Sequence, residues 1–374
     1  MKIIADENIP FVKECFSSVG DCITCRDRKI SNDILKDADA LLVRSITKVG
    51  KELLAGTNVK FVGTATIGFE HIDLDYLAKN NIGFSSAPGS NANSVSEYIT
   101  SAFLNLADKY KFDISQKSIG IVGAGCVGSK VEKKAKALGM RVVLNDPPLE
   151  RKTCDKKYRP INEIFSCDII TLHTPLTSEG MDKTYHLADE AFFKSLKKGA
   201  IFINSSRGGV HDTTALKNAL TGGQLTACVL DVWENEPSID LELLDMVDFA
   251  TPHIAGYSYD GKVAGMIMIY EGFCRNFGIE PKQKIANFLQ RPEIEKIVLD
   301  KDEKKPVLKA VNLLYDIRND DADLRRIKNE PADKRGAFFD ALRKNYPVRR
   351  EFQNTIVCTR DEKLKNIFKG LGFN

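Results

Sequence analysis

Long apolar runs are missing from this 374-residue sequence: none approaches the about 18–20 residues that span a bilayer. The first residues, MKIIADENIP, reach an acidic side chain at Asp6. They therefore lack the apolar stretch of a secretory signal and are typical of a first strand. We expect no membrane partner and a cytoplasmic protein.

Cysteine frameworks and metal-ligand clusters are also missing. The nine cysteines are an odd number, spread along the chain without framework spacing, which indicates free thiols in a reducing compartment. Cys22 and Cys25 form one C-x-x-C, but neither a following helix nor a second ligand pair accompanies it. Because no His, Cys, Asp and Glu residues have the spacing of metal ligands, we expect no metal.

Net charge is small, at +3, but it is unevenly placed. Residues 281–374 hold 22 Lys and Arg against 15 Asp and Glu, a net of +7, which leaves 32 against 36 and a net of −4 elsewhere. Acidic residues interrupt the basic ones, as in Asp323-Leu324-Arg325-Arg326, and no motif of basic and stacking aromatic residues is present. The tail therefore favours a solvated surface or a subunit interface, and we expect no nucleic-acid partner.

What is present is ordinary globular composition, with 43% hydrophobic and 28% charged residues over a length of two or three domains. Short apolar runs alternate with polar helical stretches in the first part of the chain. This alternation predicts a parallel sheet covered by helices on both faces. The predicted strands are residues 2–5, 22–25, 40–43, 59–62 and 82–84.

A second alternating region begins at Ser118, after an amphipathic segment at 94–111 that connects two domains. Its predicted strands are residues 118–122, 141–145, 167–172, 200–204, 225–230 and 247–250. An apolar helix around 263–273 is expected to return to the first domain. The expected division is a first domain of residues 1–93 and 257–280, a second of residues 94–256, and a third, α+β, of residues 281–374.

A G-x-G-x-x-G loop directly follows the strand at 118–122 and precedes a helical pattern. It consists of Gly123, Ala124, Gly125, Cys126, Val127 and Gly128. Such a loop allows a tight turn and a close backbone approach to a pyrophosphate, and the helix N-terminus offers N–H groups to the anion. Asp146 ends the next strand, where an acid meets the adenosine ribose hydroxyls and repels a 2′-phosphate. The pattern predicts a Rossmann domain that binds NAD rather than NADP.

Three later strands are each followed by an ionisable residue: Arg207, Glu236 and His253. Because the carboxyl ends of parallel strands share one edge, we expect these side chains to converge on the nicotinamide end of the dinucleotide. A histidine can take the proton of an alcohol while hydride leaves the carbon, and a carboxylate on its other nitrogen fixes its tautomer. An arginine can hold a substrate carboxylate through two N–H bonds. The three residues therefore predict hydride transfer.

The segments GAGCVG, LHTPLT, NSSRGG, DVWENEP and TPHIAG together resemble the D-isomer-specific 2-hydroxyacid dehydrogenase family. The resemblance implies a flavodoxin-like substrate-binding domain, a Rossmann NAD domain and an α+β dimerisation domain. It implies that Arg207, Glu236 and His253 are catalytic, with His253 as the acid/base. It also implies NAD contacts from Asp146, Thr174, Asp231 and Gly256.

Further segments narrow the resemblance: LLVRSITKV, GTATIGFEHID, SAPGSNANSVSEY, HIAGYSYDGK, YDIRNDDADLR and LRKNYPVRREF. They imply oxidation of a phosphorylated four-carbon 2-hydroxy acid, substrate contacts from Ser45, Thr66 and Tyr257, and a homodimer formed by the C-terminal domain. Strand capping by Ser45 and Thr66, and simple packing of Tyr257, stay open. Two other functions also stay open: a dehydrogenase of 3-phosphoglycerate, hydroxypyruvate or glyoxylate, and a non-catalytic NAD-sensing protein.

Overall fold

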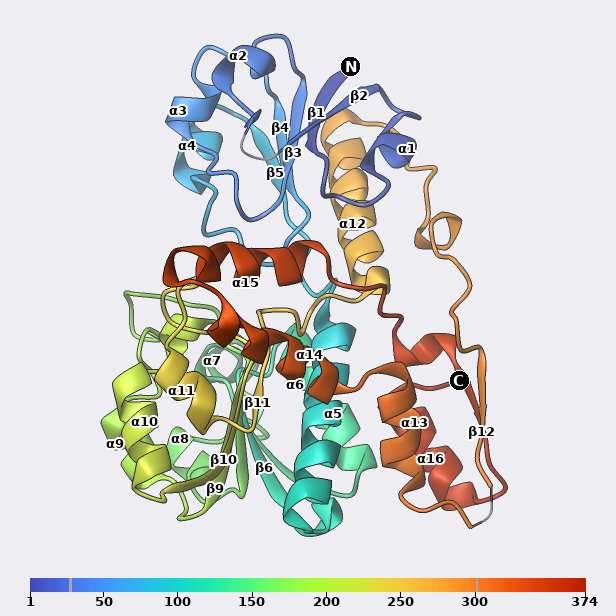
Figure 1. Cartoon of the computed structure of the whole chain (residues 1–374). Helices are drawn as coiled ribbons and strands as arrows, with labels where there is room; N and C mark the ends of the chain where they lie inside the picture. Colours follow the sequence, from blue (N-terminus) through green and yellow to red (C-terminus); the bar gives the residue numbers. More distant parts are fainter. Residues whose placement is uncertain (27–28, 301) are drawn as a thin grey trace. The chain divides into compact units, whose positions relative to one another are not determined.

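The computed structural model describes residues 1–26, 29–300 and 302–374. They form two compact units, one of residues 1–91 and 258–291 and the other of residues 92–257 and 292–374 (Figure 1). Among the described residues, no helix combines the length and the apolar character needed to cross a membrane.

The first unit is built on a five-stranded parallel sheet with the strand order β2-β1-β3-β4-β5. Its strands are β1 (Lys2–Asp6), β2 (Asp21–Cys25), β3 (Ala40–Val43), β4 (Phe61–Thr64) and β5 (Gly83–Ser85). Its helices are α1 (Val12–Phe16), α2 (Asn32–Leu35), α3 (Lys51–Leu54), α4 (Leu74–Lys79) and α12 (Tyr259–Phe277).

Both faces of this sheet are covered, because successive side chains of a strand point to opposite faces. Ile3 packs into one hydrophobic cluster with residues of α1 and α12, whereas Ile4 packs into another beneath α2, α3 and α4. All residues of β3 and β4 are buried, as expected for strands between two helical layers. The predicted return of the chain through an apolar helix is confirmed, since Met266, Tyr270 and Phe273 of α12 lie in the first cluster.

The second unit contains a six-stranded parallel sheet with the order β11-β10-β9-β8-β6-β7. Its strands are β6 (Ser118–Val122), β7 (Arg141–Asn145), β8 (Ile169–Leu172), β9 (Ala200–Asn204), β10 (Leu225–Leu230) and β11 (Phe249–Ala250). The helices of this part are α5 (Ala92–Tyr110), α6 (Cys126–Ala137), α7 (Pro147–Thr153), α8 (Ile161–Ile164), α9 (Glu190–Ser195), α10 (Thr213–Thr221) and α11 (Leu241–Met246). The strand order reverses direction between β6 and β8, and ligands bind at the carboxyl ends of strands at such a switch point.

The two predicted parallel sheets are confirmed, and five of the predicted strands have the observed bounds: β3, β6, β7, β9 and β10. β4 lies two residues further along the chain than expected (Phe61–Thr64 instead of 59–62), and β11, expected over 247–250, contains only Phe249 and Ala250. Val247 is absent from it because its N–H still bonds to the Leu243 carbonyl at the end of α11 (3.2 Å).

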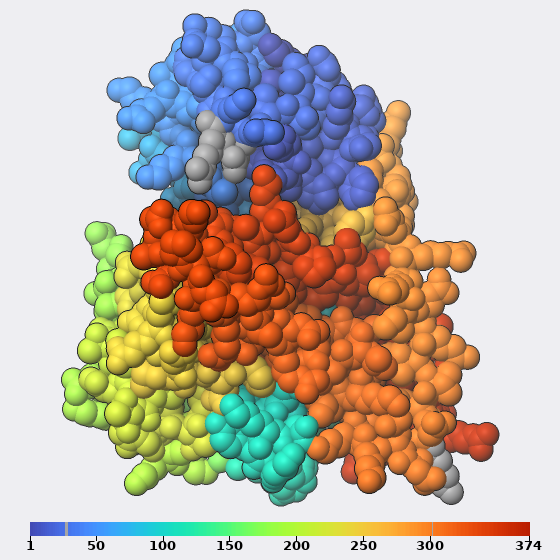
Figure 2. Space-filling model, viewed as in Figure 1, coloured from blue at the N-terminus to red at the C-terminus, as the bar shows by residue number. Residues whose placement is uncertain are grey.

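The C-terminal residues add a small α+β region to the second unit. Its elements are β12 (Lys296–Val298), α13 (Pro306–Leu314), α14 (Ile317–Arg325), α15 (Arg335–Lys344), β13 (Ile356–Cys358) and α16 (Glu362–Leu371). Ile317 and Leu371 are buried in the same hydrophobic cluster as residues of α5 and α6, and Phe339 is buried in the cluster on the other face of the sheet. The orange and red segment in Figure 2 accordingly covers part of the visible face of this unit.

Candidate active site

The glycine loop joins β6 to α6, and each of its glycines has a different local environment. Gly123 has a φ of +88°, and a Cβ there would lie 2.6 Å from the His173 carbonyl oxygen. At Gly128 a Cβ would lie 2.0 Å from the Gly123 carbonyl oxygen, so this position requires glycine to let α6 pack against the loop. A Cβ at Gly125 would meet nothing within 4 Å. Gly125 therefore borders open space, as a loop that receives a ligand must.

The start of α6 is suited to an anion. Gly125 caps the helix without any side-chain hydrogen bond, and Cys126, at the first position, is exposed. Backbone N–H groups at a helix N-terminus without a side-chain cap are donors for a phosphate. The loop therefore fits the pyrophosphate of a dinucleotide.

Thr174 follows β8 and lies against the same loop, since its backbone nitrogen is 3.0 Å from a Cβ placed at Gly123. The hydroxyl oxygen of Thr174 is buried and has no hydrogen-bond partner among the described residues. The hydroxyl of Ser205, which follows β9, is likewise buried without a hydrogen-bond partner among the described residues. Because buried polar groups are rarely left unsatisfied, two such hydroxyls after the neighbouring strands β8 and β9, one of them against the glycine loop, are what a bound cofactor would satisfy.

Asp146 lies at the end of β7, as predicted. One carboxylate oxygen accepts a hydrogen bond from the Ala124 N–H of the glycine loop (2.8 Å), and the other caps α7 by accepting from Leu149 N–H (2.9 Å). The acid is thereby fixed to the loop. This position suits an acid that meets the adenosine ribose.

Asp231, at the end of β10, organises the loop that carries His253. Its buried carboxylate accepts hydrogen bonds from Thr251 Oγ1 (2.7 Å), Ile254 N–H (2.7 Å) and Ala255 N–H (3.0 Å), and its carbonyl accepts from His253 N–H (2.7 Å). Burial raises the pKa of Asp231, and these bonds oppose the rise. They also hold His253 at a φ of +58°, a left-handed conformation that is costly for any residue but glycine.

Glu236 and His253 come together as predicted. Glu236 Oε2 lies 2.8 Å from His253 Nδ1, and Glu236 Oε1 accepts from Trp233 N–H at 2.8 Å. Burial opposes ionisation of Glu236, but the charge and hydrogen bond of His253, the Trp233 N–H and the charge of Arg343 lower its pKa below the ordinary value. The carboxylate is therefore charged at neutral pH, and Nε2 of His253 is left for chemistry.

Arg207 lies in the loop after β9 and is half-buried. Its Nη1 donates to the Ser206 carbonyl at 2.8 Å. A Cβ on the next residue, Gly208, would lie 2.0 Å from the Trp233 carbonyl oxygen, so the backbones of the two loops touch. The contact joins the segment of Arg207 to the segment of Glu236.

Tyr257 follows Gly256 at the end of the His253 loop. Its ring lies edge-on to Tyr346 (centroids 5.9 Å apart) and beneath the guanidinium of Arg343 (5.8 Å). Arg349, from the same C-terminal segment, is buried and donates to the carbonyls of Ser94 (3.1 Å) and Ala255 (2.7 Å). The C-terminal segment thus contacts the loop that presents His253 at Ala255 and Tyr257.

Ser45 and Thr66 lie in the first unit, after the neighbouring strands β3 and β4, and therefore at one edge of its sheet. Thr66 Oγ1 donates to the Gly68 carbonyl (2.9 Å) and lies 2.7 Å from Thr64 Oγ1, which lies 3.1 Å from His71 Nε2. Because the one Thr66 proton is used, Thr64 donates to Thr66, and His71 Nε2 donates to Thr64. Burial lowers the pKa of His71, which favours its neutral form. The chain of bonds leaves Thr66 as a hydrogen-bond acceptor.

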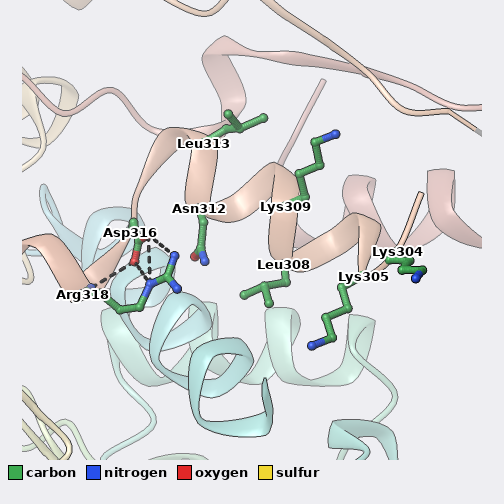
Figure 3. Close-up of a pocket in the computed structure, with 8 residues that line it drawn as sticks. All are labelled: Lys304, Lys305, Leu308, Lys309, Asn312, Leu313, Asp316 and Arg318. Atoms are coloured by element: carbon green, nitrogen blue, oxygen red, sulfur yellow. Dashed lines mark hydrogen bonds and ion pairs between the residues drawn. The ribbon is translucent and has the colours of Figure 1, made fainter. Parts of the chain in front are cut away.

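A separate hollow of about 450 Å³ lies in the C-terminal region around α13 (Figure 3). It is lined by Lys304, Lys305, Leu308, Lys309, Asn312, Leu313, Asp316 and Arg318. Lys305, Lys309 and Arg318 are paired with Asp108, Glu303 and Asp316. None of the predicted site residues lines this hollow. In the described parts of the chain, no three His, Cys, Asp or Glu side chains are grouped to hold a metal ion.

Comparison with known proteins agrees with this geometry. The family D-isomer specific 2-hydroxyacid dehydrogenase, NAD binding domain, matches residues 94–255, and a domain of unknown function (DUF3410) matches residues 288–372. Erythronate-4-phosphate dehydrogenase of Cronobacter sakazakii is 46% identical over 376 aligned residues, covering 100% of this chain and 98% of the relative. The corresponding protein of Escherichia coli O7:K1 is 45% identical with the same coverage.

Solved structures give the same picture for part of the chain. D-lactate dehydrogenase of Aquifex aeolicus, complexed with NAD and lactic acid, matches with a TM-score of 0.60 and 27% identity over 73% of this chain and 96% of that one. NAD-bound 3-phosphoglycerate dehydrogenase of Entamoeba histolytica matches with a TM-score of 0.63 and 26% identity over 74% and 95%.

A Rossmann domain whose glycine loop and histidine–carboxylate pair both follow the carboxyl ends of one parallel sheet defines a class, the nicotinamide-dependent dehydrogenases. Within that class, the chain belongs to the D-isomer-specific 2-hydroxyacid dehydrogenase family. The predicted family, fold class and NAD-binding domain are confirmed.

Several residues around the site were not expected from the sequence. Tyr98 donates to Thr251 (2.9 Å), Thr64 and His71 orient Thr66, and Arg343 and Arg349 reach the His253 loop. The sequence pointed to them only in that they lie in segments, such as LRKNYPVRREF, that resemble the family. The resemblance of these segments does not indicate the contacts that each side chain makes.

Proposed function

We propose that this protein oxidises erythronate 4-phosphate at C2 with NAD, giving 3-hydroxy-2-oxo-4-phosphobutanoate. The observation that carries the proposal is the 46% identity to the Cronobacter enzyme along the whole chain. The lactate and 3-phosphoglycerate dehydrogenases match only 73% and 74% of it and leave out about a quarter of its residues.

The catalytic roles follow from the pair in the second unit. His253 Nε2 takes the proton of the C2 hydroxyl as the carbon loses hydride, and Glu236 stabilises the resulting imidazolium through the 2.8 Å bond to Nδ1. Arg207 holds the substrate carboxylate and polarises the forming carbonyl. NAD, when bound, supplies the hydride acceptor.

The cofactor is held by the residues around the switch point of the second sheet. The glycine loop from Gly123 to Gly128 binds the pyrophosphate, and Asp146 binds the adenosine ribose and excludes NADP. Thr174, Asp231 and Gly256 complete the proposed NAD site. The buried hydroxyl of Thr174, without a partner among the described residues, supports this assignment.

Ser45, Thr66 and Tyr257 are the proposed substrate-binding residues. The orientation of the Thr66 hydroxyl as an acceptor suits a substrate hydroxyl. In this division of labour, residues 1–93 with 257–280 form the substrate-binding domain, residues 94–256 the NAD domain and residues 281–374 the dimerisation domain.

A homodimer through the C-terminal domain is part of the proposal. Five large apolar side chains of this domain are exposed: Ile285 (37%), Val298 (66%), Leu313 (49%), Val348 (75%) and Ile356 (51%). Val298 and Ile356 lie on the outer face of the two-stranded sheet β12–β13, whose inner face buries Ile297. Gathered apolar side chains are typical of an interface. Replacing Val298 and Ile356 with Asp should give monomers by light scattering, and an intact dimer would place the interface elsewhere.

A cytoplasmic location is also proposed. All nine cysteines are free thiols, Cys126 and Cys154 exposed among them, which suits a reducing compartment.

The activity is tested with purified protein and three acids: 4-phospho-D-erythronate, 3-phosphoglycerate and unphosphorylated D-erythronate. NADH absorbance and the 2-oxo acid product should both be followed, with an added 2-oxo acid acceptor in case NADH stays bound. A strong preference for the phosphorylated four-carbon acid is expected. Equal or better use of 3-phosphoglycerate would keep the family and overturn the substrate, and NAD binding without turnover of any of the three would favour a sensing role.

A further inference from the structure

Arg343 is a cation of α15 that lies against Tyr257, the residue at the end of the His253 loop. Its guanidinium stands 5.8 Å from the centre of the Tyr257 ring and is hydrogen-bonded to that side chain. Gly336, about two turns before Arg343 in α15, approaches Pro237, the residue after Glu236: a Cβ on Gly336 would lie 3.3 Å from the proline ring. The helix is therefore seated on the segment that carries Glu236.

The charge of Arg343 is incompletely matched within the protein. The side chain is only 24% exposed, its Nε atom is buried, and that atom has no hydrogen-bond partner among the described residues. Asp340 is 3.9 Å from Nη1 and is itself 50% exposed, which makes a weak ion pair. A guanidinium withdrawn from water is costly unless hydrogen bonds to an anion compensate it.

Glu236 does not supply that anion directly. Its two oxygens are already bonded to Trp233 N–H and His253 Nδ1 (2.8 Å each). The Arg343 charge does act on it, as one of the influences that lower the pKa of Glu236. The charge of Arg343 therefore reaches the Glu236 carboxylate, and the Nε–H of Arg343 has no hydrogen-bond partner among the described residues.

The proposed substrate has two anionic ends. Arg207 is assigned to the carboxylate next to C2, so the phosphate at C4 needs another cation. A guanidinium offers N–H groups in a fork that matches phosphate oxygens.

We propose that Arg343 binds the phosphate group of the substrate, so that the C-terminal domain contributes a specificity-determining residue to the active site. This inference rests on the proposed function for the identity of the substrate. Tyr257, which contacts the guanidinium, would hold it in place while the phosphate arrives.

The test compares Arg343→Met and Arg343→Lys with the unmodified protein and with Lys344→Met, which removes an exposed charge from the neighbouring position of the same helix. KM and kcat are measured with 4-phospho-D-erythronate and with unphosphorylated D-erythronate. Binding of both acids to the NAD-loaded protein is also measured by calorimetry, so that affinity is read without turnover.

Arg343→Met should weaken binding of the phosphorylated acid about 10- to 100-fold, as the loss of hydrogen bonds to a charged group implies, and leave the unphosphorylated acid unchanged. Arg343→Lys should show a smaller loss because one point charge replaces the fork, and Lys344→Met should show none. If Arg343→Met does not fold, the affinities of Arg343→Lys for the two acids decide whether Arg343 binds the phosphate.

Equal losses for both acids would overturn the proposal, because they would make Arg343 a positioning residue for Tyr257 and Glu236. An unchanged affinity in both Arg343 variants would overturn it as well. If the unmodified protein binds the phosphorylated acid but does not oxidise it, the proposed function fails while the phosphate site of Arg343 is upheld by the calorimetric difference.

Discussion

Replacing Glu236 with Gln removes the carboxylate charge beside His253 and keeps a side chain of nearly the same size. The carboxylate oxygen and His253 Nδ1 are 2.8 Å apart, and the two side chains are only 20% and 31% exposed. The pair is therefore largely shielded from water. A charge-assisted hydrogen bond has its full effect in such a shielded place.

The magnitude follows from the strength of such a bond. A hydrogen bond to a charged group contributes about 1.5–3 kcal/mol, which corresponds to a factor of about 10–150 in rate if the bond acts on the transition state. The loss should fall on kcat, because the bond to Glu236 stabilises the imidazolium that forms as hydride leaves the substrate.

The assay is the rate of erythronate 4-phosphate oxidation by the Glu236→Gln variant across pH. Glu234→Gln is a matched control, because Glu234 lies two residues away but contacts a different histidine, His186 (2.7 Å). The control should keep a rate close to that of the unmodified protein. A rate loss in Glu236→Gln no greater than that of the control would refute the role given to the pair.

Three further outcomes are expected. Asp146→Ala should shift cofactor preference from NAD toward NADP, measured as the ratio of kcat/KM values, and an unchanged ratio would assign the exclusion of the 2′-phosphate to another residue. Thr64→Val should raise the substrate KM about fivefold, because the Thr66 hydroxyl loses a hydrogen-bond donor worth about 1 kcal/mol. An unaltered KM would show that Thr66 does not bind the substrate. Burial lowers the pKa of His211 to about 4, below the 6.5 of an ordinary histidine, so this residue's contribution to stability is complete above pH 6.5 and is lost as pH falls toward 4. Urea denaturation between pH 7 and 4.5 should show about 2–3 kcal/mol more loss for the unmodified chain than for His211→Gln, and parallel curves would contradict it.

The strands and the approach of Glu236 to His253 were predictable because both follow local rules. Apolar runs such as Ser118–Val122 and Ala200–Asn204 define buried strands, and functional residues stand where such strands end. Glu236 and His253 follow different strands, so their approach required only that the sheet be parallel.

Other parts of the site depend on contacts between distant residues. Asp231 was expected to meet NAD, but nothing in the sequence indicated that its carboxylate would bond to the N–H groups of Ile254 and Ala255. Arg343 is about 90 residues from His253 along the chain, and its place beside Tyr257 depends on how α15 packs. The Thr66 hydroxyl is oriented through Thr64 by His71. No sequence pattern indicates that His71 lies beside Thr64.

Hydride transfer from C2 is the central claim, and an isotope label tests it most directly. The protein is incubated with NAD and 4-phospho-D-erythronate carrying deuterium at C2, and the cofactor is recovered by denaturation and analysed by mass spectrometry. The account predicts reduced nicotinamide that contains deuterium, together with the unlabelled 2-oxo acid. Product formed with no deuterium in the cofactor, or a cofactor that stays oxidised beside unreacted substrate, would contradict it.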